Sequence, residues 1–188
     1  MADDMLRLEE LEAALPAMTR WRVSGRREVD WAALEAALGV ALPSDFRSFS
    51  EAYPALVIDD FLMVSLPVPG EEALWASGRT EDDILQDLYE MGDAEEYVPY
   101  PGPGGLVSWA ESNSGDAFYW KTSPADPEKW PVVIRTDNGE WFEFPVGAVE
   151  FLARVYGRVI DVPGMPRNFP SDSPQVLGLG DRTDRSTA

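Results

Sequence analysis

The chain has 188 residues, of which 45% are hydrophobic and 26% charged, as in an ordinary globular domain. It contains no cysteine and no histidine, which excludes disulfides, thiolate and imidazole metal ligands, and catalytic pairs of serine or cysteine with histidine. The net charge of −19 opposes binding to the phosphates of nucleic acid. It favours a basic partner, although the same charge also promotes solubility.

The first residues and the lengths of the apolar runs indicate the cellular compartment of the protein. Residues 1–5 lack the basic and apolar regions of a secretory signal. No apolar run approaches the ~20 residues that a membrane-spanning helix needs. We therefore expect a cytoplasmic protein without membrane contact, and the sequence indicates no cofactor and no metal site.

Three helices are predicted in the first third of the chain. Residues 5–19 place apolar side chains at spacings of three and four. Asp30 and Gly39 are typical start and stop residues for a second helix over residues 31–38. Pro43 suits the first turn of a short third helix, whose apolar stripe is formed by Phe46, Phe49 and Tyr53.

A strand, an acidic helix and a loop are predicted next. Residues 61–66 are rich in large apolar side chains, which favours a strand. Residues 80–83 have the spacing of a capping box with an acidic first turn. The helix that they start has an apolar face of Ile84, Leu85, Leu88 and Tyr89. Glycines and prolines make residues 97–105 a loop.

Two hairpins and a last helix complete the predicted elements. Residues 106–110 and 117–121 are two strands joined by a turn, as are residues 131–135 and 141–144. The second turn contains Asn-Gly, the strongest short hairpin signal. The last helix has one apolar face and ends at a glycine, as Val149, Leu152, Ala153, Tyr156 and Gly157 indicate.

The order of these elements predicts an α+β fold, in which a single twisted antiparallel sheet packs against N-terminal and C-terminal helices. We divide the chain into an N-terminal helical extension (1–27), a main domain (28–160) and a tail rich in Pro, Gly and Ser (161–188). The composition of the tail predicts an extended and disordered segment, above all beyond Leu179.

Several short motifs in this order resemble one family. They are Val29-Asp30-Trp31-Ala32-Ala33-Leu34-Glu35, Leu38-Gly39, Leu42-Pro43-Ser44-Asp45-Phe46, Ser114-Gly115-Asp116-Ala117-Phe118-Tyr119-Trp120 and Val149-Glu150-Phe151-Leu152. Together they are similar to the SUKH superfamily (Smi/Knr-like domains), which includes bacterial toxin-immunity proteins and fungal cell-wall-synthesis regulators. The resemblance covers residues 28–157. It departs from the pattern in the helix before Trp21 and at Ala52–Ala55, where the family has Asn-Gly.

The resemblance implies a non-enzymatic binding protein, monomeric or weakly dimeric. Its first implied function is that of an immunity protein, which neutralises a co-encoded basic protein toxin of the nuclease or deaminase type by occlusion. An alternative is a regulatory scaffold with several weaker partners, for which the tail would be a recruitment segment. A remote alternative, taken from the residues themselves, is a glycoside hydrolase that uses carboxylates alone.

The candidate partner-binding residues come from two features. Residues 59–96 hold twelve carboxylates and a single basic residue, Arg79, although a solvated helix face explains such a run equally well. Aromatic residues in the predicted loops are the candidate anchors, because tryptophan and tyrosine dominate binding hot spots, whereas Trp31, Trp120 and Trp141 are expected in the core. Glu111 and Asp116 flank the first hairpin turn and are either turn and partner contacts or a catalytic pair. The full candidate set is Trp75, Glu81, Asp82, Asp83, Asp87, Glu90, Glu95, Glu96, Tyr97, Tyr100, Glu111 and Asp116.

Overall fold

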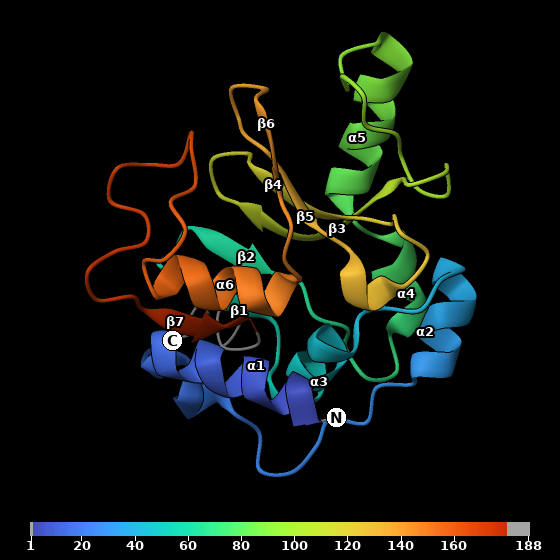
Figure 1. The fold of residues 1–188 in the computed structure, drawn as a ribbon. Coiled ribbons are helices and arrows are strands. Elements are labelled where there is room, and N and C mark those ends of the chain that lie inside the picture. The colour runs from blue at the N-terminus through green and yellow to red at the C-terminus, as the bar shows by residue number, and fades with distance from the viewer. Residues whose placement is uncertain (1, 180–188) are drawn as a thin grey trace, which may run out of the picture.

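The computed structural model describes residues 2–179, with side chains from residue 7 onward. Its helices are α1 (Ala2–Ala14), α2 (Trp31–Leu38), α3 (Ser44–Ala52), α4 (Glu72–Ser77), α5 (Thr80–Met91) and α6 (Ala148–Tyr156), with 3₁₀ turns at Pro16–Trp21 and Pro127–Lys129. Its strands are β1 (Leu56–Ile58), β2 (Leu62–Val64), β3 (Leu106–Ser112), β4 (Ala117–Lys121), β5 (Val132–Arg135), β6 (Trp141–Phe144) and β7 (Val176–Gly178). The order of α and β elements is shown in Figure 1.

All seven strands form one antiparallel sheet in the order β6-β5-β4-β3-β2-β1-β7. The α+β class predicted from the sequence is therefore confirmed, and so are the β3–β4 and β5–β6 hairpins. Side chains alternate between the two faces of each strand. In β4, for example, Phe118 and Trp120 belong to one core cluster while Ala117 and Tyr119 belong to another.

The larger cluster lies between the sheet and α1, α3 and α6 (Figure 1). The N-terminal and C-terminal helices, α1 and α6, pack against each other. Phe46 of α3 meets Trp120 edge to face, with ring centroids 4.6 Å apart. Trp31 and Trp120 are buried as predicted, whereas Trp141 is half-buried on the other face.

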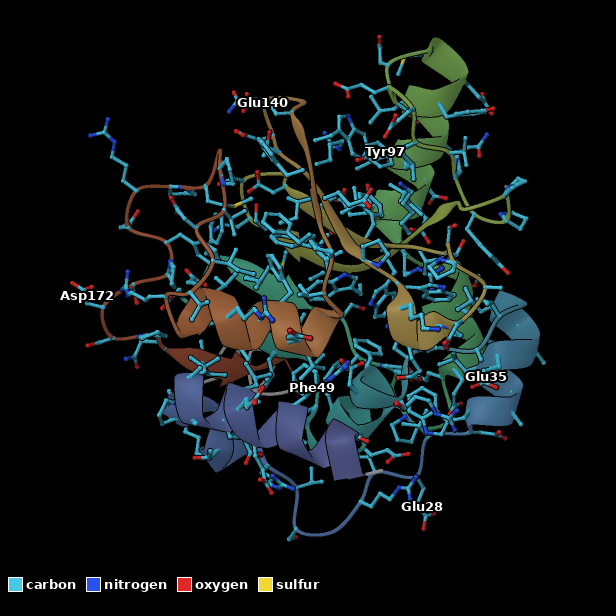
Figure 2. The ribbon with its side chains drawn as sticks, in the orientation of Figure 1. Glu28, Glu35, Phe49, Tyr97, Glu140 and Asp172 are labelled. Carbon is cyan, nitrogen blue, oxygen red and sulfur yellow. The ribbon has the colours of Figure 1, made fainter. Side chains whose placement is uncertain are left out.

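The smaller cluster lies on the opposite face, beneath α5. It joins Leu85 of α5 and Tyr97 of the following loop to Tyr119 and Val133 of the sheet. Tyr97 stacks on Trp141 of β6 at 4.6 Å, so that it lies between α5 and the sheet (Figure 2). These contacts fix the base of α5 to the sheet.

The predicted strand at residues 61–66 is in fact half of a hairpin. β1 precedes β2, and the turn between them holds Asp59 and Asp60 at φ values of 58° and 52°. Aspartate tolerates this left-handed region better than most residues, because its short polar side chain can hydrogen-bond locally. β1 was missed because it has three residues and follows Pro54 without a turn signal.

The N-terminal extension and the tail belong to the same core as the main domain. Leu8 and Leu11 of α1 are buried in it. Residues 161–179 return to the sheet, where β7 pairs with β1, so the prediction of a disordered tail is corrected for these residues. Residues 180–188 lie outside the described part of the chain. The composition of the tail was misleading because side chains far away in the sequence hold it.

Asp59 is the main anchor of the returning segment. Its carboxylate accepts hydrogen bonds from the backbone and hydroxyl of Ser171, at 3.1 and 2.8 Å, and from the backbone N–H of Gln175 at 3.0 Å. Arg158 reinforces the segment by donating to the carbonyl oxygens of Pro170 and Ser171. One carboxylate thus ties the C-terminal strand to the β1–β2 turn.

We expect Asp59→Ala to lower the free energy of unfolding by about 2 kcal/mol, because it removes these charge-assisted hydrogen bonds and places alanine at a positive φ. Asp59→Asn is the matched control, since asparagine tolerates this backbone and keeps one acceptor oxygen; it should lose less. Urea denaturation measures both, and amide exchange at residues 176–178 reports on β7 directly. Equal stability of Asp59→Ala and the unmodified protein would contradict the anchoring role.

Candidate functional site

The most prominent surface feature is α5 with the turn that follows it, which we call the acidic arm (residues 80–96). The helix ends at Gly92, whose φ of 83° is left-handed and therefore suits glycine. Exposed carboxylates cover it: Asp83, Asp87, Glu90, Asp93, Glu95 and Glu96. In Figure 1, α5 rises away from α1 and α6 and carries these charges out from the body.

The start of α5 differs from the predicted capping box. The N-cap position is Arg79, and Thr80 makes no capping hydrogen bond. Asp82 instead turns toward the sheet, where one oxygen accepts from the backbone N–H of Ser108 at 2.9 Å and the other from Arg79 Nε at 2.7 Å. The acidic first turn therefore docks the helix on β3 instead of closing its end.

The acidic first turn of α5 favours the helix dipole, but the charges beyond it do not. Asp83 and Asp87 are four residues apart, a spacing at which like charges destabilise a helix. Glu90 lies in the last turn, which has no basic residue, and a negative charge there opposes the helix dipole. Glu90 accepts a hydrogen bond from Gln86 Nε2 at 2.8 Å, but the other exposed carboxylates beyond the first turn make no such contact among the described residues. Their concentration on one projecting element points to a use outside the fold.

Exposed apolar side chains accompany this charge. Tyr89 and Met91 near the end of α5 are 50% and 66% exposed, and Leu74 of α4 is 63% exposed. Tyr89 was predicted on the buried face of the helix, and the structure places it outside. An exposed tyrosine and methionine among carboxylates have the composition of a protein contact surface.

The aromatic anchors predicted from the sequence are not part of this surface. Trp75 lies on α4 instead of in a loop; it is 9% exposed, donates from Nε1 to Ser65 Oγ, and stacks beneath the guanidinium of Arg79. Tyr97 is 8% exposed because it packs against Trp141. Tyr100 is half-buried against the main core. All three stabilise the fold, and Tyr89 was the aromatic that the sequence reading missed.

A cavity of about 170 Å³ opens at the base of the arm, between the start of α5 and strands β2 and β3. Glu81 and Glu111 contribute carboxylates to it. Ser65 and Ser108 also line it, Met63 contributes an apolar wall, and Trp109 contributes its backbone, because the Trp109 ring packs against Phe151 on the other face of the sheet. Glu81 and Glu111 are 30 residues apart in the sequence and meet because β3 runs beneath the first turn of α5.

Glu81 is the most unusual group in this cavity. It is 7% exposed, and its Oε2 accepts no hydrogen bond from any described residue. The nearest cation, Arg135 Nη2 of β5, lies 3.7 Å from that oxygen and donates to the carbonyl oxygen of Gly115 at 3.3 Å. Burial raises the pKa of Glu81 to about 7, opposed by Arg135 and reinforced by the charge of Glu111.

Asp116 does not join Glu111 in this cavity. It is 1% exposed beneath the hairpin turns, where it accepts from Ser112 Oγ and, at 3.0 Å, from the backbone N–H of Asp137. It therefore connects the β3–β4 turn to the β5–β6 turn. Asp116 thus makes the turn contact that the sequence suggested, and the remote alternative of a catalytic pair has no support, because Asp116 does not line the cavity with Glu111.

Seven of the twelve predicted residues form two groups, and the other five make contacts within the fold, namely Trp75, Asp82, Tyr97, Tyr100 and Asp116. Five of the seven are exposed on the arm, namely Asp83, Asp87, Glu90, Glu95 and Glu96, and two line the cavity, namely Glu81 and Glu111. Arg135 was not predicted. Its position opposite Ala117 in the hairpin register places it on the α5 face, and a hairpin model with alternation would have indicated this.

Two further searches of residues 2–179 bear on the class of site. No group of three or more acidic side chains in this range is arranged to hold a metal ion. Within the same range, no helix is both long and apolar enough to cross a membrane.

Comparison with known proteins adds no family. The sequence matches no protein-family model. A search of curated proteins finds no similar chain, and a search of solved structures finds no significant match.

Proposed function

We propose that this chain is a non-enzymatic binding protein whose acidic arm captures a basic protein. The observation that carries the proposal is the concentration of exposed carboxylates on the acidic arm, next to exposed Tyr89 and Met91. A field of this sign accelerates encounter with a positively charged surface. The apolar side chains would then supply affinity that salt does not screen.

The order of sequence motifs that resemble the SUKH superfamily extends the proposal to a class of partner. An immunity-type protein would bind a basic toxin of the nuclease or deaminase type and occlude its active site. A toxin that handles nucleic acid needs a basic surface of its own, which an acidic arm can cover. Occlusion requires a rigid projecting element, and α5 is fixed to the sheet through Leu85, Asp82 and Tyr119.

The scaffold alternative has less support. It used residues 161–188 as a recruitment segment, but residues 161–179 are engaged by Asp59, Arg158 and β1. The hydrolase alternative used Glu111 with Asp116, which the structure separates. We therefore base the test on the arm.

The test compares two variants of equal charge. One neutralises the arm (Asp87→Asn, Glu90→Gln, Glu96→Gln), and the control neutralises three exposed carboxylates elsewhere (Glu9→Gln, Glu10→Gln, Glu28→Gln). Glu28 lies at the opposite end of the molecule from α5 (Figure 2). Proteins captured from the native host are identified by mass spectrometry, and the leading candidate is purified for titration.

We expect the arm variant to bind this partner about tenfold more weakly at low salt, with a smaller difference at high salt, and the control variant to bind normally. We also expect the arm variant to be more stable than the unmodified protein by about 0.5–1 kcal/mol, and therefore to unfold at a slightly higher temperature. The substitutions relieve the repulsion between Asp83 and Asp87 and the unfavourable contact of Glu90 with the helix dipole. Equal loss of binding in both variants would show that net charge alone acts, and would overturn the proposal. Suppression of the partner's toxic activity by the unmodified chain tests the immunity function itself.

A further inference from the structure

We propose that the cavity between Glu81 and Glu111 is a subsite for the guanidinium of a single arginine side chain on the partner protein. This inference rests on the proposed function, and it assigns the base of the arm a specific contact in addition to the arm's diffuse charge. The charge balance, the size and the lining of the cavity support this subsite.

The cavity lacks one positive charge. Arg79 is committed elsewhere: its Nε bonds Asp82 at 2.7 Å, its Nη1 donates to the carbonyl oxygen of Trp75 at 3.2 Å, and its plane covers the Trp75 ring. Arg135 therefore pairs with Glu81, at 3.7 Å from its Oε2, and no ion pair to Glu111 is present among the described residues. When Glu81 is ionised, the two carboxylates and this one cation leave the cavity with a net negative charge.

One carboxylate oxygen in the cavity is ready to accept a hydrogen bond. Glu81 Oε2 is buried and accepts no hydrogen bond from the described residues. A buried oxygen without a partner is unfavourable, and native structures keep few of them. A donor supplied by a partner would satisfy this oxygen, which the fold itself leaves without one.

The dimensions select a side chain over a whole metabolite. Pockets for small-molecule ligands have volumes of roughly 300–1,000 Å³, whereas this cavity has about 170 Å³. Its walls combine carboxylates with the apolar residues Met63 and Leu179. Arginine fits such a lining because its methylene stem packs on apolar surface while its planar fork donates to carboxylates.

The subsite is continuous with the arm. Glu81 is the second residue of α5, and Asp83 and Asp87 follow it along the same helix. A basic surface that approaches the arm therefore meets the cavity at its base. The arm would steer the partner, and the cavity would fix its register through one arginine.

The test uses a small probe in place of the unidentified partner. N-acetyl-arginine amide is titrated into the full chain, and its neutral isostere N-acetyl-citrulline amide is titrated in parallel, with backbone amide NMR shifts as the readout. We expect saturable shifts at the backbone amides of Ser108, Trp109 and Glu111, which line the cavity, with the arginine probe, and none with citrulline. Glu111→Gln should weaken binding about tenfold or more, as loss of a charge-assisted hydrogen bond predicts.

Glu10→Gln on α1 is the matched control, because it removes the same charge from the other side of the sheet. Thermal unfolding of each variant checks that it is folded. Equal weakening by Glu10→Gln, shifts spread over the acidic surface, or binding of citrulline as strong as that of arginine would each overturn the subsite. If the probe fails to bind while the arm variant still loses its partner, the subsite is wrong and the proposed function stands. If the probe binds while the arm variant keeps its partner, the subsite stands as a guanidinium site and the proposed function is wrong.

Discussion

Phe46→Ala should lower the free energy of unfolding by about 3–5 kcal/mol, the range for removing a large aromatic ring from a packed core. Phe46 is 1% exposed. Its ring meets Trp120 of β4 edge to face at 4.6 Å and approaches Trp75 of α4 at 6.2 Å. One side chain therefore joins α3, α4 and the centre of the sheet, and its loss leaves a cavity that these rigid rings cannot fill.

The measurement is urea denaturation followed by tryptophan fluorescence, which reports on both neighbouring indoles. Phe46→Leu is the control, since a large apolar side chain retains most of the volume and should lose less than half as much. Phe46→Ala with a stability within about 1 kcal/mol of the unmodified protein would mean that α3 does not form part of the cooperative core.

The sequence predicted the elements whose signals are local. The two hairpins were found because alternating apolar strands flank turn residues, and the second turn carries Asn-Gly. Phe46 was placed on the apolar stripe of a helix by its spacing from Phe49 and Tyr53. Such patterns depend on the period of one element and need no knowledge of the neighbouring ones.

The features that the sequence missed depend on distant residues. Trp75 looked exposed because charged residues surround it, yet Ser65 and Arg79 enclose it. Residues 161–179 looked disordered because proline breaks periodicity, yet Asp59 binds them across more than 110 residues of sequence. Composition describes what a segment contains and does not show what lies beside it.

In the candidate site, too, the sequence predicted the local feature and missed the one that depends on distant residues. The arm was predicted because its carboxylates are close together in the sequence, although the inward turn of Asp82 was not. The cavity required Glu81 from α5, Glu111 from β3 and Arg135 from β5 to meet on one face of the sheet. No spacing rule relates these three positions, because the sheet register and the docking of α5 bring them together.

Glu81→Gln should make the protein more stable at pH 8 and leave it almost unchanged at pH 5. The folded chain holds the Glu81 proton up to a pH of about 7, the raised pKa of this carboxyl, because burial disfavours its charged form. The unfolded chain releases the same proton near the ordinary value of 4.5. Between these two values the folded state binds more protons, so the free energy of unfolding falls as the pH rises.

The size of the change in unfolding free energy follows from the difference between the folded and unfolded pKa values of Glu81. A difference of one pKa unit corresponds to about 1.4 kcal/mol, so the complete effect of Glu81 is on the order of 3 kcal/mol. Asp45 contributes in the same direction at lower pH, because burial raises its pKa to about 6. Denaturation of the unmodified protein should therefore show decreasing stability from pH 5 to pH 8, the opposite of ordinary acid denaturation.

Glutamine at position 81 cannot ionise. The Glu81→Gln variant therefore loses the part of the pH dependence of stability that Glu81 causes and keeps the part that Asp45 causes. Asp45→Asn is the reciprocal variant and should remove the lower part alone, which separates the two groups. A Glu81→Gln variant with the same pH profile as the unmodified protein would show that Glu81 is already ionised at neutral pH, neutralised by Arg135. If the Glu81→Gln variant does lose the fall in stability with rising pH, then the ionised Glu81 carboxylate lowers the stability of the unmodified protein at neutral pH. An ionised Glu81 is then better explained by a bound cation than by the fold, because a guanidinium that binds only the folded state would restore the lost stability by mass action.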